Sequence, residues 1–175
     1  MLQSVLTSRG PSSETYGILG RVYKDRYDRA KSASEFVARA ELDKAIEAYL
    51  KGFEADWRDA YPGINAVTLM ELRQPPDPRQ AELIPLVTYA VKRRVACAKP
   101  DYWDFATLLE LAVLARDGER VLNALGPVLT SIRESWMAET TLRNLDLIAE
   151  TRQTRGEPPP EWFTTVLSEL QKRAS

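Results

Sequence analysis

The residues YGILGRVY at positions 16–23 and AIEAYLKG at positions 45–52 indicate two helices that pack closely against each other. In the first stretch, Tyr16, Leu19, Gly20 and Tyr23 recur three and four residues apart, which is the spacing of one helix face. The second stretch repeats this spacing with alanine, tyrosine and glycine. Small residues let two helices approach each other, and large residues fill the space beside them. These two stretches therefore predict a helical hairpin.

The same helical spacing continues through the rest of the chain, and no alternation typical of a strand is long enough to matter. A serine at position 12 or 13 is suited to cap the first helix, since its hydroxyl can accept a bond from a free backbone amide. The sequence predicts an all-α protein of about four helical hairpins. Its helices are expected at about 12–29, 40–55, 62–74, 78–97, 101–116, 119–132, 134–154 and 160–173.

Several segments are expected to interrupt or bend these helices. Residues 30–38 are small and polar and predict a loop or a weak helical extension. The cluster Pro75-Pro76-Asp77-Pro78 predicts a break, and Asp117-Gly118 is expected to close the fifth helix. Pro85 predicts a kink or a late start in the fourth helix, and Gly126-Pro127 a bend in the sixth.

The order of small and aromatic residues resembles the tetratricopeptide pattern. That pattern has an aromatic residue, then Leu-Gly, then Tyr, and in its second helix an alanine, an aromatic and a small residue. Tyr16, Leu19-Gly20 and Tyr23 match the first half, and Ala45, Tyr49 and Gly52 the second. The resemblance implies a tetratricopeptide-like α-solenoid, whose hairpins stack on one another. One departure is an extra stretch of about a dozen residues between the two halves, which predicts a long loop between the helices.

Three segments in this order, Gly20–Asp25, Ala45–Glu54 and Tyr61–Leu69, are similar to a more specific family. They resemble the central helical-repeat region of the apoptosis signal-regulating MAP kinase kinase kinases, called the TRAFs-binding domain, and suggest a bacterial-type member. The motifs lie within residues 14–72, and beyond them the likeness is one of architecture. The resemblance implies that the region regulates an attached or associated effector through protein contacts. The family's domain extends further on its N-terminal side, so no TRAF partner is predicted.

Composition argues against catalysis and against a metal or cofactor. The chain has no histidine, which is the commonest general base and metal ligand, and one cysteine, so no internal disulfide can form. Glu110, Glu119, Glu134 and Glu139 belong to no motif that would pair them in an active site. We therefore expect no enzyme activity, no catalytic residues, no metal site and no cofactor.

The charge balance and hydropathy bear on partners and location. The formal net charge is −1, which gives no overall field to attract nucleic acid. No stretch approaches the ~18 apolar residues that a membrane span needs. We expect a cytoplasmic protein that binds neither a membrane nor nucleic acid. The run Lys92-Arg93-Arg94 is interpreted as a solvated helix face rather than a phosphate site.

Six residues in or beside the first hairpin are the candidates for partner binding: Arg21, Lys24, Asp25, Tyr61, Asn65 and Thr68. The charged residues of the first helix suit either a groove that holds a partner peptide or an internal ion pair to the long loop. Asn65 follows the turn at Pro62-Gly63, where its amide could bind a peptide backbone or could cap or bridge neighbouring helices.

The remaining singled-out residues are expected to be structural. Cys97 has no histidine to activate it and is predicted to be a small buried residue. Trp103, Trp136 and Trp162 lie among leucines at helical spacing and are predicted to pack in the core or between hairpins, with an exposed apolar patch as the alternative.

The sequence favours a protein-interaction scaffold or regulatory module for an unidentified protein partner. An alternative is a sensor of a small signalling molecule, for which Arg21, Lys24 and Arg39 are the clustered candidates. The apolar face of the last helix could cap the array or form a homo-oligomer. We expect a single helical-repeat domain over residues 1–175, and the early start of the motif is compatible with a fragment of a longer protein.

Overall fold

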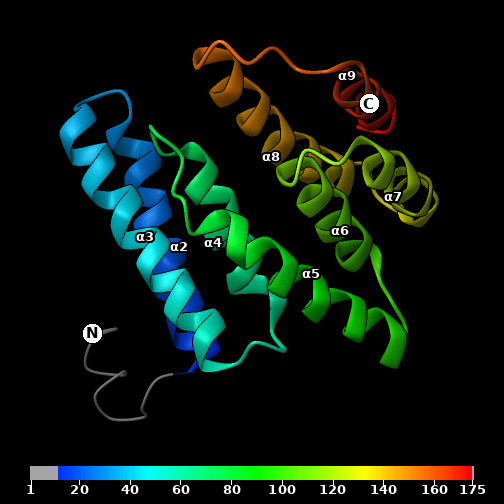
Figure 1. Cartoon of the computed structure of the whole chain (residues 1–175), viewed down its shortest axis with the longest axis horizontal. Coiled ribbons are helices and arrows are strands. Elements are labelled where there is room, and N and C mark those ends of the chain that lie inside the picture. The colour runs from blue at the N-terminus through cyan, green and yellow to red at the C-terminus, as the bar shows by residue number, and fades with distance from the viewer. Residues whose placement is uncertain (1–11, 175) are drawn as a thin grey trace. The chain divides into compact units, whose positions relative to one another are not determined.

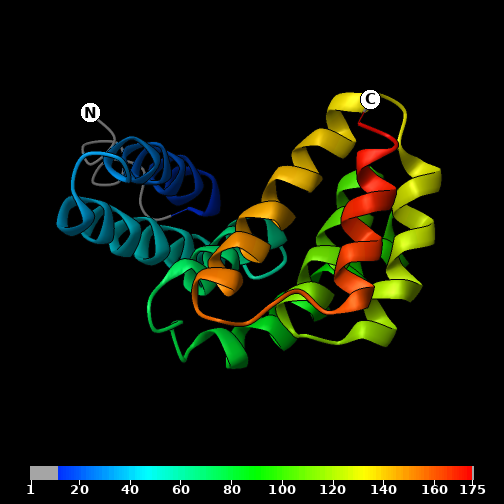
Figure 2. The same ribbon diagram turned by 90° about the horizontal axis from the view of Figure 1, so that it is seen from above.

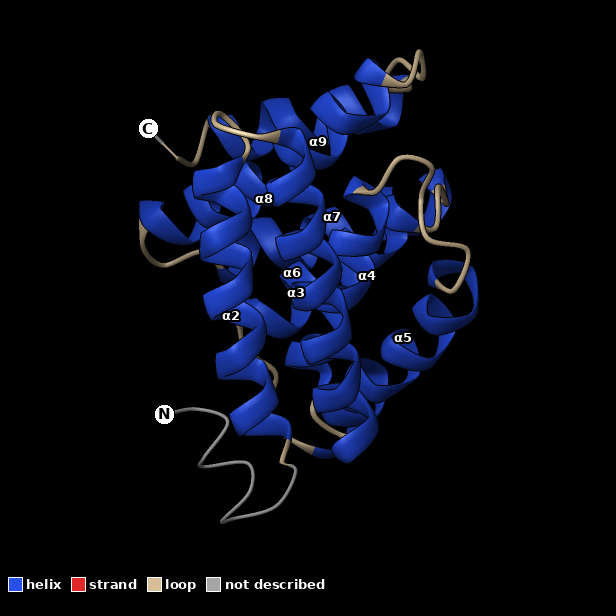
Figure 3. Ribbon diagram, turned by 90° about the vertical axis from the view of Figure 1, so that its left-hand side faces the viewer, coloured by secondary structure: helices blue, strands red, loops and turns tan. Residues whose placement is uncertain are grey.

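A computed structural model describes residues 12–174 as eight helices without a strand (Figures 1 and 3). The helices are α2 (Ser13–Ala30), α3 (Glu35–Ala55), α4 (Ala60–Leu72), α5 (Gln80–Cys97), α6 (Tyr102–Leu114), α7 (Gly118–Ser131), α8 (Ser135–Thr154) and α9 (Glu161–Gln171). The all-α prediction is confirmed, and the helical hairpins are consistent with an α-solenoid. The tetratricopeptide assignment and the single domain stay predictions.

The described part of the chain divides between residues 90 and 91 into two compact units. In the first unit, α2 and α3 lie side by side as a hairpin (Figures 1 and 2), and α4 packs against both. The start of α2 is the predicted one, since the Ser12 side chain accepts a hydrogen bond from the backbone N–H of Thr15. A serine cap at this position satisfies an amide that the helix itself leaves free.

The predicted long loop between the first two helices is wrong, and the alternative for residues 30–38, a helical extension, holds from Glu35 onward. Ser34 caps α3 by accepting a bond from the N–H of Val37, so the helix begins at Glu35 and not near residue 40. Only residues 31–34 remain between α2 and α3. The extra residues are absorbed as additional helical turns because alanine and glutamate favour helix once a cap is in place.

Close approach within the first unit depends on glycines that face aromatic rings. A Cβ at Gly20 would lie 2.7 Å from Cγ of Tyr49, and a Cβ at Gly63 would lie 2.9 Å from Cδ2 of Phe53. A Cβ at Gly52 would lie 3.2 Å from Cβ of Tyr16. The predicted packing of small against large residues is therefore present in the α2–α3 hairpin.

In the second unit, α6 packs against α7 and α8, and α9 packs against α7 and α8. The hydroxyl of Tyr102 lies 2.9 Å from the carbonyl oxygen of Met137 and 2.6 Å from Oγ1 of Thr141, which joins α6 to α8. The Arg152 guanidinium, 3% exposed, donates to the carbonyl oxygens of Val113 and Leu114 at the end of α6.

The junction between α6 and α7 agrees with the prediction in part. Asp117 takes part in closing α6 as predicted, since its backbone N–H donates to the carbonyl oxygen of Ala112 at 3.1 Å. Arg116 takes the left-handed conformation there (φ 58°), and the Asp117 side chain caps the next helix by accepting from the N–H of Arg120. Gly118 instead allows close packing, because a Cβ at this position would lie 2.7 Å from Cδ1 of Trp162 on α9. Pro85 and Gly126-Pro127 are accommodated inside α5 and α7. Over the described residues, no helix is long and apolar enough to cross a membrane.

Candidate functional site

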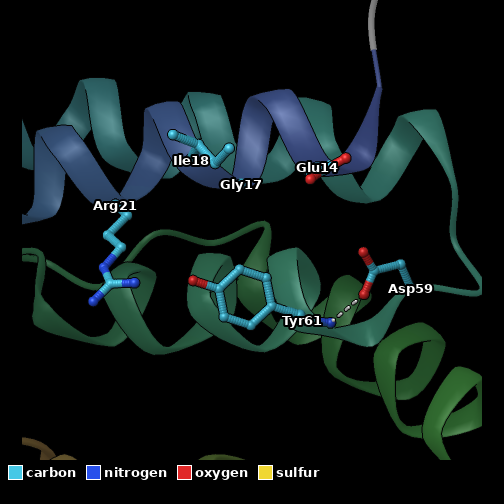
Figure 4. A pocket seen from close by; sticks show the side chains of 6 residues that line it. All are labelled: Glu14, Gly17, Ile18, Arg21, Asp59 and Tyr61. Atoms are coloured by element: carbon cyan, nitrogen blue, oxygen red, sulfur yellow. Dashed lines mark hydrogen bonds between the residues drawn. The ribbon is translucent and has the colours of Figure 1, made fainter.

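A surface hollow of about 280 Å³ lies between α2 and the start of α4 (Figure 4). The α2 side chains in it are spaced three and four residues apart and so share one helix face. The lining residues are Glu14, Gly17, Ile18, Arg21, Asp59 and Tyr61. The hollow thus belongs to the first unit alone.

The middle of the hollow is apolar. Tyr61 is 50% exposed and Ile18 is 47% exposed, and both face solvent here. The Tyr61 ring passes close to α2 because position 17 is glycine: a Cβ there would lie 3.3 Å from Cε1 of Tyr61. Behind it, the buried Tyr49 ring contacts Tyr61 edge to face, with ring centroids 6.1 Å apart. The exposed ring therefore rests on a fixed support.

Asp59 holds the two sides of the hollow together. Its Oδ1 accepts a hydrogen bond from the N–H of Tyr61 at 3.1 Å, which caps α4. Its Oδ2 accepts a bond from the hydroxyl of Ser13 at 2.5 Å. The first residue of α2 and the cap of α4 are thus tied to one carboxylate, which sets how far apart the helices begin.

The charges in the hollow are separated. Arg21 lies at one end, and the carboxylates of Glu14 and Asp59 lie at the other, with Tyr61 between them (Figure 4). Burial, and then the neighbouring Tyr61, raise the pKa of Tyr49 far above its ordinary value of 10.0. The phenolate form of Tyr49 is thus strongly disfavoured, as expected for a buried ring that serves packing.

The structure brings two of the six candidate residues into the hollow, Arg21 and Tyr61. Asn65 instead donates its amide to the carbonyl oxygen of Tyr61 at 2.9 Å, and the buried Thr68 donates to the carbonyl oxygen of Ile64 at 2.8 Å. Both side chains are thus bonded to the backbone of their own helix. For Asn65 this differs from the expected alternative, in which its amide caps or bridges neighbouring helices.

Lys24 and Asp25 lie outside the hollow. Within residues 12–174, no ion pair joins either of them, or Arg21, to another side chain, so the interpretation as an internal ion pair is not supported. The three cations proposed for a small-molecule sensor do not converge either. Of Arg21, Lys24 and Arg39, only Arg21 lines the hollow.

Sequence reasoning missed Glu14, Gly17, Ile18 and Asp59. The signal for the first three was available, because they lie seven, four and three residues before Arg21 and so on its helix face. Asp59 could have been found as the residue that precedes the third helix, since aspartate is a preferred cap.

Other predicted environments differ as well. Cys97, the last residue of α5, is exposed and not buried. Trp103 and Trp136 are 39% and 51% exposed, so their assignment to the core is wrong, whereas Trp162 packs against Gly118 as predicted. Lys92, Arg93 and Arg94 form an exposed helix face. In the part of the chain that the structure describes, no three metal-ligating side chains cluster.

Comparison with known proteins gives a consistent picture. The family model for the MAP3K TRAFs-binding domain matches residues 1–165, well beyond the motifs at 14–72. The chain is 30% identical over 144 residues to "Mitogen-activated protein kinase kinase kinase nsy-1" of Caenorhabditis elegans, an alignment that covers 79% of this chain and 9% of that protein. It is 26% identical over 164 residues to "Mitogen-activated protein kinase kinase kinase 15" of Mus musculus, covering 91% of this chain and 12% of that one. The chain thus spans about a tenth of the length of these relatives. Neither of them supports the prediction of a bacterial-type member.

Proposed function

Because the chain belongs to the family of MAP3K TRAFs-binding domains, we propose that it is a non-enzymatic scaffold or regulatory module of the cytoplasm. In this proposal the hollow between α2 and α4 holds a segment of a partner protein, and the contact controls an effector. The family's description supports a protein partner, since it names TRAFs as what such domains bind.

The observation that carries the proposal is the arrangement of the hollow. An exposed tyrosine on a rigid backing is the type of residue that dominates protein interfaces, and arginine is enriched there as well. Tyr61 and Arg21 supply this pair, with Ile18 beside them. Opposite charges at the two ends favour one direction of a bound peptide, because the reverse direction would bring like charges together.

The size of the hollow also favours a peptide side chain over a free small molecule. Its volume, about 280 Å³, is at the lower edge of the ~300–1,000 Å³ typical of small-molecule sites. A single arginine in it falls short of the convergent cations that an anionic signalling molecule would require.

The experiment uses a photo-crosslinking amino acid in place of Ile18, a partly exposed residue of the hollow. Irradiation with a purified TRAF protein, the first candidate that the family description suggests, should yield an adduct that mass spectrometry locates. Arg21→Glu and Tyr61→Ala should each reduce the adduct and weaken binding by about tenfold, as expected for interface anchors.

Arg39→Glu is the matched control, because Arg39 is an exposed arginine of the same unit that does not line the hollow. It should bind like the unaltered chain. Equal affinity of the chain and both hollow variants would place the contact elsewhere on the surface. Loss of binding in Arg39→Glu with retention in Arg21→Glu would also contradict the assignment.

A further inference from the structure

Two tryptophans of the second unit form an exposed pair. Trp103 of α6 and Trp136 of α8 have ring centroids 5.8 Å apart at an interplanar angle of 40°. Trp103 is 39% exposed and Trp136 is 51% exposed, although the helices that carry them pack against each other. Paired tryptophans are costly to leave in water, and they are the residues that contribute most to protein interfaces.

The buried Tyr102 supports the tryptophan pair from the side that faces the core. Tyr102 is 3% exposed and meets the Trp103 ring edge to face, with centroids 5.0 Å apart. Its hydroxyl joins the carbonyl oxygen of Met137 and the hydroxyl of Thr141, one and five residues beyond Trp136. The two rings are thus fixed on one rigid connection between α6 and α8, which lowers the entropy lost when a ligand binds.

The pair also arises from a motif that recurs at helix starts. The motif is an acidic residue before the helix, an aromatic residue two positions later, and an Asn or Thr four positions after that. Its three copies are Asp59-x-Tyr61-x-x-x-Asn65, Asp101-x-Trp103-x-x-x-Thr107 and Glu134-x-Trp136-x-x-x-Thr140. In every copy the last side chain donates to the carbonyl oxygen of the aromatic residue, at 2.9, 2.7 and 2.8 Å. Tyr61, the aromatic residue of the first copy, lines the hollow.

The charge beside the pair is negative. Residues 101–107 and 134–140 contain Asp101, Asp104, Glu134 and Glu139 and no basic side chain, whereas the exposed Arg133 and Arg143 lie one residue before Glu134 and four residues after Glu139. Arg94 forms ion pairs with the two aspartates, since its guanidinium lies 3.5 Å from Asp101 and 2.7 Å from Asp104. The other two are exposed: Glu134 makes no side-chain cap bond to α8, and Glu139 lies one helical turn beyond Trp136. Within the described chain neither enters an ion pair.

We propose that Trp103 and Trp136 form a second docking site, which binds an arginine side chain on an extended segment of a partner protein. The planar guanidinium stacks on the indole face, and Glu134 and Glu139 balance its charge. Lysine fits less well because its compact ammonium cannot stack as a plane. The negative surroundings oppose nucleic acid. The site lies in the second unit and does not require the hollow between α2 and α4 to bind anything.

The experiment titrates the chain with the peptide acetyl-Gly-Arg-Gly-Arg-Gly-amide and follows the indole N–H signals by NMR. The chain has four tryptophans, so Trp57 and Trp162 serve as internal controls. The Trp103 and Trp136 signals should move together with one dissociation constant, and the other two should stay. A peptide with lysine should bind about threefold more weakly, and one with citrulline, an uncharged isostere of arginine, about tenfold more weakly.

Substitutions separate the contribution of the indole rings to peptide binding from that of the two glutamates. Trp136→Leu should weaken binding about tenfold, and Glu134→Gln with Glu139→Gln about threefold, with reduced dependence on salt. Trp57→Leu, which removes a tryptophan that is 69% exposed, should change nothing. The two glutamate substitutions are at exposed positions, so they test the site even if Trp136→Leu fails to fold.

Three results would overturn the proposal. One is the absence of any shift at millimolar peptide, and another is equal binding of the arginine and citrulline peptides. The third is a dimer in light scattering that Trp136→Leu dissociates, because the pair would then be covered by a second copy of the chain.

Discussion

The ring of Tyr49 occupies the space that a side chain at Gly20 would need. A Cβ at position 20 would lie 2.7–2.8 Å from three ring atoms of Tyr49, closer than carbon atoms approach without something moving. Tyr49 is 1% exposed and in turn supports Tyr61 in the hollow. Packing inside the first hairpin therefore bears directly on the geometry of the candidate site.

Gly20→Ala should lower the free energy of unfolding by about 1–3 kcal/mol, the usual effect of an overpacked core. Alanine favours helix over glycine by about 1 kcal/mol, but the displaced ring outweighs this gain. Urea unfolding followed by circular dichroism measures the change. Gly126→Ala is the control, because apart from its chain neighbours and its own helix backbone nothing lies within 4 Å of the added Cβ, so no packed ring is displaced. The helix preference of alanine there is offset by the crowding of its Cβ against Pro127, so the free energy of unfolding should change little. A stabilised Gly20→Ala would contradict the close contact between position 20 and the Tyr49 ring.

Tyr102→Phe should cost about 1–2 kcal/mol of unfolding free energy, since it removes the hydroxyl between Met137 and Thr141 and leaves buried groups without that partner. Thr141→Val should cost a similar amount. The double variant should lose less unfolding free energy than the sum of the two single losses, because both substitutions remove the same hydrogen bond. Full additivity in urea unfolding would mean that the two hydroxyls act independently.

Arg152→Met should lower the unfolding free energy by about 2–3 kcal/mol, because the guanidinium donates to the carbonyl oxygens of Val113 and Leu114 at the end of α6. Arg152→Lys should lose less unfolding free energy, since lysine keeps the positive charge but lacks the planar guanidinium with its several N–H donors. Thermal unfolding of the three proteins should rank them in that order. A lysine variant as unstable as the methionine variant would show that charge contributes little.

Asp77 should make the free energy of unfolding depend on pH in the acid range. Hydrogen bonds from Arg79, and further from Arg73, hold the pKa of the Asp77 carboxyl well below its ordinary value of 3.8. The ionised carboxylate therefore stabilises the folded state fully above about pH 4 and progressively less as the pH falls below it. Urea unfolding between pH 5 and pH 2 should show a steeper loss in the unaltered chain than in Asp77→Asn.

The chain supplies a matched control for this prediction. Asp56 meets Arg58 with the same two-residue spacing and similar bonds, but the Arg58 side chain is 91% exposed. Asp56→Asn should leave the acid dependence almost unchanged, because solvent screens an exposed pair. An equal effect of both substitutions would show that burial of Asp77 does not matter.

Helix positions and the first hairpin could be predicted because they depend on local rules. The Ser12 cap and the spacing of Gly20, Ala45 and Tyr49 are visible in the sequence, and the structure has them in these roles. The length of the loop before α3 could not be read in the same way. It depends on whether Ser34 caps a helix, and serine is equally suited to a turn.

The exposure of individual side chains was harder to predict than the positions of the helices. Tyr102 and Trp103 are adjacent, and residues one position apart point about 100° away from each other on a helix. Only one of them can face the core, and Tyr102 is buried there, where its hydroxyl reaches Thr141. Periodicity alone does not identify which aromatic ring has such a partner. The recurring motif at the helix starts was readable in the sequence, but its meaning depends on the exposure of the aromatic residues.

The bond from Ser13 to Asp59 sets α2 and α4 level at their first residues, and the two helices differ in length. With 18 residues, α2 extends about 27 Å, whereas the 13 residues of α4 extend about 20 Å. The far end of the α2–α3 hairpin, around the exposed Ser32, therefore overhangs its neighbour. A fluorophore or affinity tag inserted at this tip would report on the hairpin without altering the residues that line the hollow between α2 and α4.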